Sequence, residues 1–202
     1  MGSTVGKGTS FLENLPPNQT LHVVMLGLDS AGKTTALYRL KFDQYLNTVP
    51  TIGFNCEKIK GTSGKAKGTS FLIWDVGGQD KLRPLWRSYT RCTDGIVFVL
   101  DSVDDERLEE ARLELVRMAR APENLGVPIL VLANKQDLPG AKDPHEIERI
   151  LGLGVELGSA HLWHVQPACA IIGDGLEEGL EILYEMILKR RRQLKQAKKK
   201  YT

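Results

Sequence analysis

Short apolar runs alternate with stretches of mixed polarity along this chain of 202 residues. Three runs rich in Val, Ile and Leu predict buried strands, at residues 21–26, 70–73 and 128–133. Residues 35–40 follow the first run and carry Leu37 and Leu40 three positions apart, which predicts a helix. The alternation predicts an α/β fold.

The loop between the first strand and that helix reads Gly-Leu-Asp-Ser-Ala-Gly-Lys-Thr and matches the phosphate-loop pattern G-x-x-x-x-G-K-[ST]. Gly27 and Gly32 permit backbone angles that let the loop N–H groups face phosphate oxygens. Lys33 is predicted to contact the β- and γ-phosphates, and Thr34 to ligate Mg²⁺. The alternative is a strand-to-helix turn that merely needs glycines. The predicted phosphate-binding residues are Gly27, Leu28, Asp29, Ser30, Ala31, Gly32, Lys33, Thr34 and Thr35.

A second motif, Asn-Lys-Gln-Asp at residues 134–137, follows the strand at residues 128–133. Asp137 can accept hydrogen bonds from the N1–H and the exocyclic amine of guanine, a pattern that adenine lacks. Such a site discriminates strongly, because the wrong base leaves a polar group unpaired. The alternative is an ordinary polar loop after a strand. The residues predicted to bind the base are Asn134, Lys135 and Asp137, with backbone groups of Cys169 and Ala170.

Two further segments lie between these motifs. Asp75 follows the strand at residues 70–73 and is predicted to bind Mg²⁺, while the N–H of Gly78 reaches the γ-phosphate. Gln79 is predicted to orient the attacking water. Thr51 is predicted to complete the Mg²⁺ ligands when the γ-phosphate is present. The predicted catalytic residues are therefore Lys33, Thr51 and Gln79, and the predicted metal ligands are Thr34, Thr51 and Asp75.

These motifs together resemble small GTPases of the Arf and Arf-like family. The resemblance covers roughly residues 20–188 and rests on the phosphate loop, on Pro-Thr-Ile-Gly-Phe-Asn at residues 50–55 and on Trp-Asp-Val-Gly-Gly-Gln at residues 74–79. Other small GTPases usually carry Thr-Ala where this chain has Val76 and Gly77. The segment from Arg87 to Gly95 and the basic C-terminal end are similar to the fourth Arf-like subgroup.

The resemblance implies a Ras-like phosphate-loop fold with a mostly parallel sheet, helices on both faces and an antiparallel edge hairpin of residues 55–60 and 69–75. It implies a cycle in which GTP holds two switch segments, around Thr51 and Gln79, and hydrolysis to GDP releases them. In Arf-type members this hairpin also slides. An exposed aromatic trio of Phe54, Trp74 and Tyr89 would bind effectors, cytohesin-type exchange factors among them, although aromatic residues are as often buried in a core.

The resemblance also bears on the rate of hydrolysis. No arginine-finger candidate occurs within the nucleotide loops, and related enzymes without one hydrolyse GTP at roughly 10⁻⁴ to 10⁻³ per second. Asp29 is expected to project near the phosphates, where its charge disfavours the transition state. We therefore expect slow unaided turnover, with an exchange factor and a GTPase-activating protein as regulators.

Composition is consistent with one folded domain at residues 20–188. The three cysteines do not suggest a disulfide framework, and a reducing cytosolic setting fits them. The apolar runs are too short to span a bilayer, and the first residues lack the apolar region of a secretory signal. Nothing in the sequence suggests a nucleic acid as partner.

The C-terminal tail, residues 189–202, contains eight Lys and Arg and no acid, so its charge is +8. Because the whole chain has a net charge of +2, the remaining residues have a net charge of −6. It follows an amphipathic helix whose leucines share one face, and residues 189–192 are expected to continue that helix before it frays. Three roles are open: a solvated end, binding of anionic lipid, or nuclear import through an importin. The basic residues are Lys189, Arg190, Arg191, Arg192, Lys195, Lys198, Lys199 and Lys200.

The N-terminal segment, residues 1–19, begins with Met1 and Gly2 and carries a candidate myristoylation site at Gly2, although Gly6 stands where Ser or Thr is usual. One acyl chain binds a membrane only marginally, so the basic tail is a candidate second signal. The expected locations are the cytoplasmic face of membranes, the plasma membrane above all, the cytoplasm and the nucleus.

Two other functions remain open on sequence alone. A phosphate-loop nucleoside kinase would need lid arginines and a phosphoacceptor pocket, but it would not need the motif at residues 134–137. A binding module that scarcely hydrolyses GTP would not need Gln79. Comparing the affinities for GTP and ATP distinguishes a GTPase from the kinase. Single-turnover hydrolysis distinguishes a GTPase from the binding module.

Overall fold

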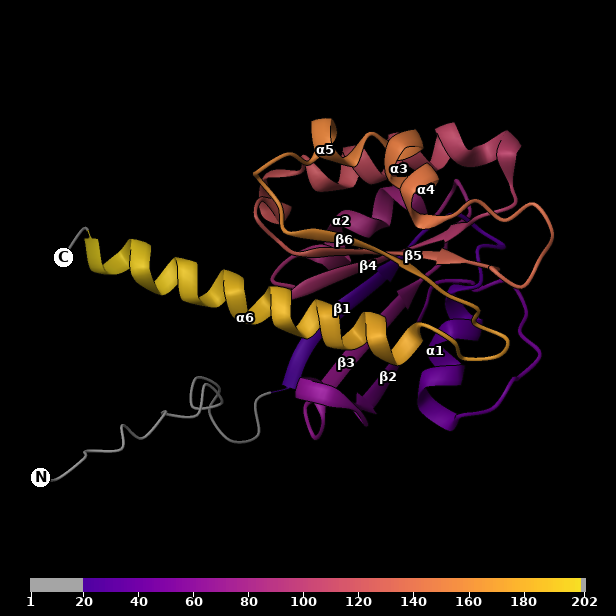
Figure 1. The fold of residues 1–202 in the computed structure, drawn as a ribbon, viewed down its shortest axis with the longest axis horizontal. Helices are drawn as coiled ribbons and strands as arrows, with labels where there is room; N and C mark the ends of the chain where they lie inside the picture. The colour runs from indigo at the N-terminus through magenta and orange to yellow at the C-terminus, as the bar shows by residue number, and fades with distance from the viewer. Residues whose placement is uncertain (1–19, 201–202) are drawn as a thin grey trace, which may run out of the picture.

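The computed structural model describes residues 20–200 and shows a six-stranded sheet between two layers of helices (Figure 1). The strand order is β2-β3-β1-β4-β5-β6, with β2 antiparallel to β3 and all other neighbours parallel. This confirms the predicted α/β fold, including the antiparallel edge hairpin. The strands are β1 (Thr20–Leu26), β2 (Phe54–Lys60), β3 (Ser70–Val76), β4 (Gly95–Asp101), β5 (Ile129–Asn134) and β6 (Trp163–Pro167), and the helices are α1 (Lys33–Phe42), α2 (Trp86–Thr90), α3 (Leu108–Ala119), α4 (Pro144–Leu151), α5 (Leu153–Glu156) and α6 (Leu176–Lys200).

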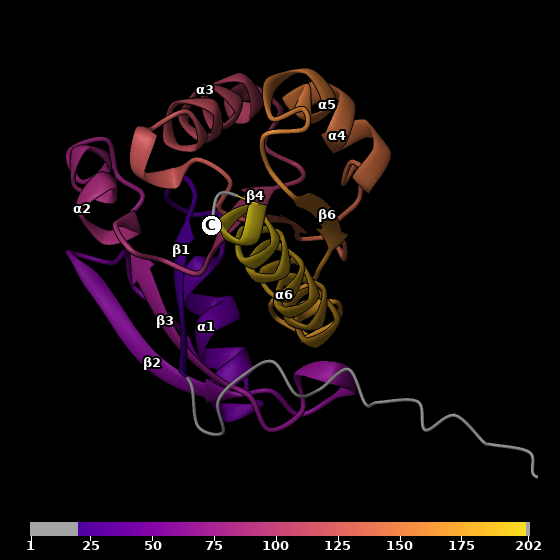
Figure 2. The same ribbon diagram turned by 90° about the vertical axis from the view of Figure 1, so that its left-hand side faces the viewer.

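The two faces of the sheet carry separate hydrophobic cores (Figure 2). Helices α1 and α6 cover one face, where Leu37 and Leu183 are fully buried against strand residues such as Val23. Helices α2 to α5 cover the other face, where Leu115 and Ile147 are fully buried. The central strands β4 and β5 are almost entirely apolar because both of their faces are covered.

The parallel strands bring their carboxyl ends to one edge of the sheet. The loops after β1, β3, β5 and β6 therefore meet there, although β1 ends at Leu26 and β6 only at Pro167. Open α/β sheets bind ligands at this edge, beyond the carboxyl ends of the strands.

The hairpin of β2 and β3 ends in a turn that packs against α6. The turn contains a 3-10 helix, Gly64–Ala66, and the N–H of Lys65 donates to Glu181 Oε1 at 2.8 Å. Lys65 Nζ lies 2.6 Å from Glu185 Oε1. Both strands begin or end within one residue of the predicted bounds, but the contact with α6 had no signal in the local sequence.

Helix α6 is longer than the sequence pattern indicated. Its apolar residues Leu176, Leu180, Leu183 and Ile187 are buried, as predicted. The helix was expected to fray after residue 192, but it continues to Lys200. Its last turns are Arg, Lys, Gln, Leu and Ala, which are good helix formers, and cations are favourable at a helix C-terminus. The helix therefore crosses the expected boundary at residue 188 without a break.

An ion pair fixes the middle of this helix to the domain. Arg191 Nη2 lies 2.7 Å from Asp94 Oδ1, in the loop before β4. Burial lowers the pKa of the neighbouring Arg190, although the charge of Asp94 acts in the opposite direction. Within residues 20–200, no helix is both long and apolar enough to cross a bilayer. Gly2 and the N-terminal segment lie outside the described residues.

Candidate nucleotide-binding site

The phosphate loop joins β1 to α1 and depends on two glycines with positive φ angles. Gly27 has φ 140°, and a Cβ there would lie 2.1 Å from the Val99 carbonyl oxygen. Gly32 has φ 95°, and a Cβ there would lie 2.3 Å from Asn134 Nδ2. The loop thus lies too close to β4 and β5 for any side chain at these two positions.

Lys33 begins α1 and is only 6% exposed. Its Nζ donates to the Leu28 carbonyl oxygen at 2.9 Å, which holds the ammonium group over the loop. Burial lowers the pKa of Lys33, while the negative charges of Asp75 and Asp29 oppose this shift. A desolvated ammonium group that retains its charge is well suited to bind phosphate oxygens.

Oxygen atoms from three segments meet beside Lys33. Thr34 Oγ1 donates to Asp75 Oδ2 at 2.6 Å and lies 2.8 Å from Thr51 Oγ1. Asn55 Nδ2 also donates to Asp75 Oδ2, at 3.2 Å. Asp75 is completely buried, and its Oδ1 has no hydrogen-bond partner among the described residues. Two hydroxyls and a carboxylate with an unpaired buried oxygen are donors suited to a hard cation such as Mg²⁺.

Asn134 connects the phosphate loop to the loops at the base end of the site. Its Nδ2 donates to the Ala31 carbonyl oxygen at 2.8 Å, and its Oδ1 accepts from the Ala170 N–H at 2.9 Å. Lys135, with φ 66°, pairs with Asp101 Oδ2 at 2.5 Å. These bonds join three loops into one frame around the base end.

Asp137 lies in the same cavity, and its Oδ1 accepts a hydrogen bond from Cys169 Sγ at 3.1 Å. Burial and this hydrogen bond to a carboxylate raise the pKa of the Cys169 thiol. The thiol therefore stays protonated and donates, which orients the Asp137 carboxylate. The sequence predicted only backbone groups at Cys169, so this side-chain role is an addition.

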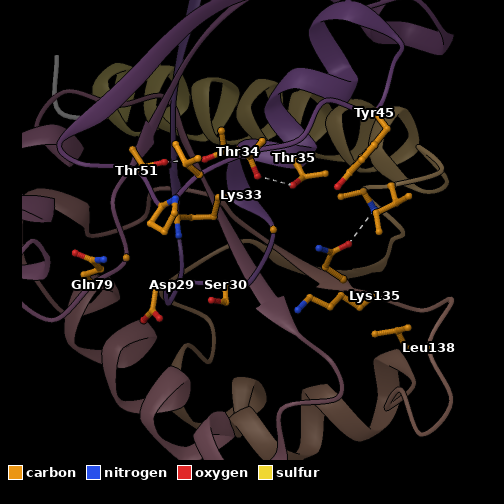
Figure 3. A pocket seen from close by; sticks show the side chains of 18 of the residues that line it. Asp29, Ser30, Lys33, Thr34, Thr35, Tyr45, Thr51, Gln79, Lys135 and Leu138 are labelled. Atoms are coloured by element: carbon orange, nitrogen blue, oxygen red, sulfur yellow. Dashed lines mark hydrogen bonds between the residues drawn. The ribbon is translucent and has the colours of Figure 1, made fainter.

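The cavity between these loops has a volume of about 370 Å³ (Figure 3). The predicted residues that line it are Asp29, Ser30, Gly32, Lys33, Thr34, Thr35, Thr51, Gly78, Gln79, Asn134, Lys135, Asp137 and Ala170. The predicted residues Gly27, Leu28, Ala31, Asp75 and Cys169 are absent from its lining. Sequence reasoning did not predict a binding role for six further residues that line it, Tyr45, Thr48, Val49, Pro50, Leu138 and Ile171. Tyr45 reaches over the cavity from the loop after α1, where no periodic pattern pointed to it (Figure 3).

The environment of Asp29 differs from the expectation. Its Oδ1 lies 3.2 Å from Arg107 Nη1 and 3.9 Å from Arg83 Nη2. Two guanidinium groups therefore offset the charge that was expected to act on the phosphates. Among the described residues no arginine lines the cavity itself.

The switch residues Gly78 and Gln79 follow β3. A Cβ on Gly78 would lie 2.3 Å from the Gly27 carbonyl oxygen and 2.5 Å from the Asp29 nitrogen, so this glycine packs directly on the phosphate loop. Gln79 is exposed and lines the cavity. Its side chain is thus free to approach a water molecule at the γ-phosphate end.

The aromatic trio forms a cluster, as the resemblance implied. The ring centroids of Phe54 and Trp74 are 5.1 Å apart, and those of Phe54 and Tyr89 are 5.5 Å apart. Phe54 is 47% exposed, whereas the other two rings pack partly on the core. The cluster lies where β2, β3 and α2 meet.

Comparison with known proteins gives consistent matches. Residues 9–187 match the model of the ADP-ribosylation factor family. The chain is 62% identical to human ADP-ribosylation factor-like protein 4A, over 99% of this chain and 100% of that protein. It is 65% identical to human ADP-ribosylation factor-like protein 4C, over 93% and 97% of the two chains. It is 60% identical to mouse ADP-ribosylation factor-like protein 4D, over 92% of each.

A solved structure is similar as well. The Arl6 BBS3 small GTPase from Trypanosoma brucei, with the bound nucleotide analogue GppNp, matches with a TM-score of 0.74 and 32% identity. The match covers 85% of this chain and 99% of that one.

The sheet order, the phosphate loop and the cavity that ends at Asp137 define a Ras-like small GTPase, which binds guanine nucleotide and hydrolyses GTP. The nucleoside-kinase alternative is thereby excluded. Within that class the chain belongs to the ADP-ribosylation factor family, in the factor-like 4 subgroup.

Proposed function

We propose that this GTPase is a slow molecular switch that binds GTP with Mg²⁺ and, in its GTP state, recruits effectors to membranes. The observation that carries the proposal is the cavity itself, with Lys33 and the Thr34–Asp75–Thr51 oxygens at one end and Asp137 at the other. This arrangement supports a triphosphate bound at the Lys33 end and a guanine ring bound at the Asp137 end.

Each residue has a defined part in the reaction of GTP and water to GDP and phosphate. The Lys33 ammonium group and the N–H of Gly78 stabilise charge on the phosphate oxygens. Gln79 holds the attacking water in line. Thr34, Thr51 and Asp75 would hold Mg²⁺, which would neutralise charge on the phosphate oxygens. Asp137 selects guanine.

The switch depends on the contacts that GTP adds. Thr51 and Gly78 belong to segments that contact each other, since the Gly77 N–H donates to the Gly53 carbonyl oxygen at 2.9 Å. A γ-phosphate binds both segments at once, and its loss releases them. The trio of Phe54, Trp74 and Tyr89 adjoins both segments and is the proposed effector surface. The family resemblance favours cytohesin-type exchange factors as effectors.

Membrane attachment is proposed to use two signals, an acyl chain at Gly2 and the basic end of α6. Arg192, Lys195, Lys198 and Lys199 are exposed on a continuous helix, so their charges project from a rigid support. Each basic residue near an anionic surface contributes about 1 kcal/mol.

Calorimetry of the full chain with Mg²⁺ and GTP, GDP or ATP tests the nucleotide proposal. We expect tight binding of both guanine nucleotides and none of ATP, whereas equal binding of ATP would contradict it. Single-turnover hydrolysis should give roughly 10⁻⁴ to 10⁻³ per second. Turnover at several per second without a partner would contradict the slow switch.

Vesicle sedimentation tests the membrane proposal. Replacing Arg192, Lys195 and Lys199 with Ala should weaken binding to phosphatidylserine-containing vesicles roughly a hundredfold, since three charges near the surface are lost. Arg149→Ala on α4 is the matched control and should have no effect. In cells, combining Gly2→Ala with the tail substitutions should release the protein, and persistent membrane binding would contradict the two-signal anchor. Loss from the nucleus instead would favour the import role.

A further inference from the structure

A groove between α2 and α3 has no part in the site described above. Its volume is about 550 Å³, and it lies between the start of α2 and the C-terminal half of α3. The two helices lie side by side on one face of the sheet (Figure 2). Its apolar wall is formed by Pro84, Trp86, Met118, Ala121 and Pro122. The volume falls within the range of pockets that hold small ligands or inserted side chains.

One residue of this groove carries an unused hydrogen-bond acceptor. Asn124 lines the groove and is 1% exposed. Its Nδ2 donates to the Met118 carbonyl oxygen at 2.8 Å, which fixes the orientation of the amide. Its Oδ1 is buried and has no hydrogen-bond partner among the described residues. Buried polar atoms are nearly always paired, so this oxygen calls for a donor.

The rim of the groove is basic. Three arginines and one glutamate lie there, Arg87, Arg117, Arg120 and Glu114, while a fourth arginine of the lining, Arg83, is only 8% exposed and pairs with Asp80 and Glu110. Arg87, Arg117 and Arg120 are mostly exposed, and each pairs with one carboxylate: Arg87 of α2 with Glu123 of the turn after α3, Arg117 with Glu114 of α3, and Arg120 with Glu156 of α5. A guanidinium group has five N–H donors, so each retains donors for a second carboxylate.

Two walls of the groove are attached to the switch segment. Trp86 Nε1 donates to the Gly77 carbonyl oxygen at 3.0 Å. Arg83 Nε donates to the Gly78 carbonyl oxygen at 2.9 Å. A shift of the Gly77–Gly78 segment on loss of the γ-phosphate would therefore move both side chains and change the shape of the groove.

We propose that this groove binds a segment of a partner protein, in which an aromatic side chain with an N–H donor is flanked by carboxylates. The aromatic ring packs on Trp86 and Met118, its N–H donates to Asn124 Oδ1, and the carboxylates pair with Arg117 and Arg120. An indole ring satisfies both the apolar wall and the acceptor, and aromatic anchors in pockets dominate protein interfaces. This surface is separate from the aromatic trio, which lies at β2, β3 and α2.

The dependence on nucleotide rests on the proposed switch, whereas the binding itself does not. The groove should be open to the peptide in the GTP state, because the Gly77–Gly78 segment is then held in place. We expect at least about fivefold tighter binding to protein loaded with a non-hydrolysable GTP analogue than to protein loaded with GDP.

The probe is the N-acetylated, C-amidated peptide Asp-Glu-Trp-Glu-Asp, titrated into the full-length protein and followed by NMR. Amide signals of residues 83–90 and 114–124 should shift. Replacing the peptide's Trp with Phe should weaken binding about fivefold, the contribution of one neutral hydrogen bond. Replacing its acids with Lys should abolish binding.

Variants of the protein supply the controls. Ala121→Trp fills the groove and should abolish the shifts, and Arg117→Glu with Arg120→Glu should weaken binding about tenfold or more. Arg149→Glu, an exposed arginine on α4, should change nothing. Shifts centred elsewhere, retained binding by Ala121→Trp, or no shifts at roughly millimolar peptide in either nucleotide state would overturn the proposal. A protein that binds guanine nucleotide but not the peptide contradicts this groove alone.

Discussion

The two ends of the nucleotide cavity are built in different ways. At the base end, buried groups bond to each other across three loops, as Asn134 bonds to both Ala31 and Ala170. At the γ-phosphate end, the residues around Thr51 are exposed, with Val49 at 81% and Ile52 at 91%. A preformed base end is suited to select guanine without rearrangement, while the exposed loop around Thr51 is able to respond to the nucleotide. The difference teaches that selectivity and switching occupy opposite ends of one site.

The largest expected effect concerns base selection at the preformed end. Asp137→Asn replaces an acceptor of guanine N–H groups with an amide, and GTP affinity should fall at least about a thousandfold. Xanthosine triphosphate carries an oxygen where guanine has its amine, so the amide N–H can donate to it. Its affinity should rise in competition assays with a fluorescent nucleotide. Equal loss of both nucleotides would mean that Asp137 supports the loop instead of reading the base.

A second effect concerns the frame itself. Asn134→Ala leaves the Ala31 carbonyl oxygen and the Ala170 N–H unpaired in a buried site, which should lower the free energy of unfolding by about 3 kcal/mol. GTP affinity should fall roughly a hundredfold as the loops separate. Urea denaturation and calorimetry measure the two changes. Gln193→Ala, which removes an exposed side chain on α6, is the control and should leave both values nearly unchanged.

A third effect isolates the exposed end. Gln79→Leu should slow single-turnover hydrolysis about tenfold to a hundredfold, because the attacking water loses its orientation. Stability should change by less than about 0.5 kcal/mol, since the side chain is exposed. Gln196→Leu on α6 is a matched exposed glutamine and should not alter hydrolysis. A large loss of stability in Gln79→Leu would show that this end is as rigid as the other.

The smallest effect reports on the Asp137–Cys169 contact. Burial and the bonded carboxylate raise the pKa of the Cys169 thiol, so little reactive thiolate forms at pH 8. Iodoacetamide should label the exposed Cys92 first and Cys169 slowly, and GDP should slow Cys169 further. Mass spectrometry of peptides measures both rates. Labelling of Cys169 as fast as Cys92 would show that the base end opens in solution.

The sequence predicted the nucleotide loops well, because each is a short motif with its own backbone requirement. Gly32, Lys33 and Asp137 all line the cavity between these loops, as their motifs predicted. The same reasoning could not place Tyr45 over the cavity, because the loop after α1 has no periodic pattern.

Contacts between distant segments escaped the sequence entirely. The pairing of Asp29 with Arg107 joins residues 78 positions apart, and charged side chains give no sign of their partners until the fold brings them together. The length of α6 was underestimated for another reason. The charged, polar stretch after residue 188 was interpreted as a tail outside the folded domain. Its intrinsic helix propensity is nevertheless high, and Arg191 pairs with Asp94 of the domain.

The turn of the β2–β3 hairpin has a mechanical consequence. Side chains alternate between the faces of a strand, so a displacement of the hairpin along β1 must come in steps of two residues, or about 7 Å. One such step would pull Lys65 away from Glu181 and Glu185 on α6. The two carboxylates of α6 therefore stabilise the register that the hairpin has in this structure over a register shifted by two residues.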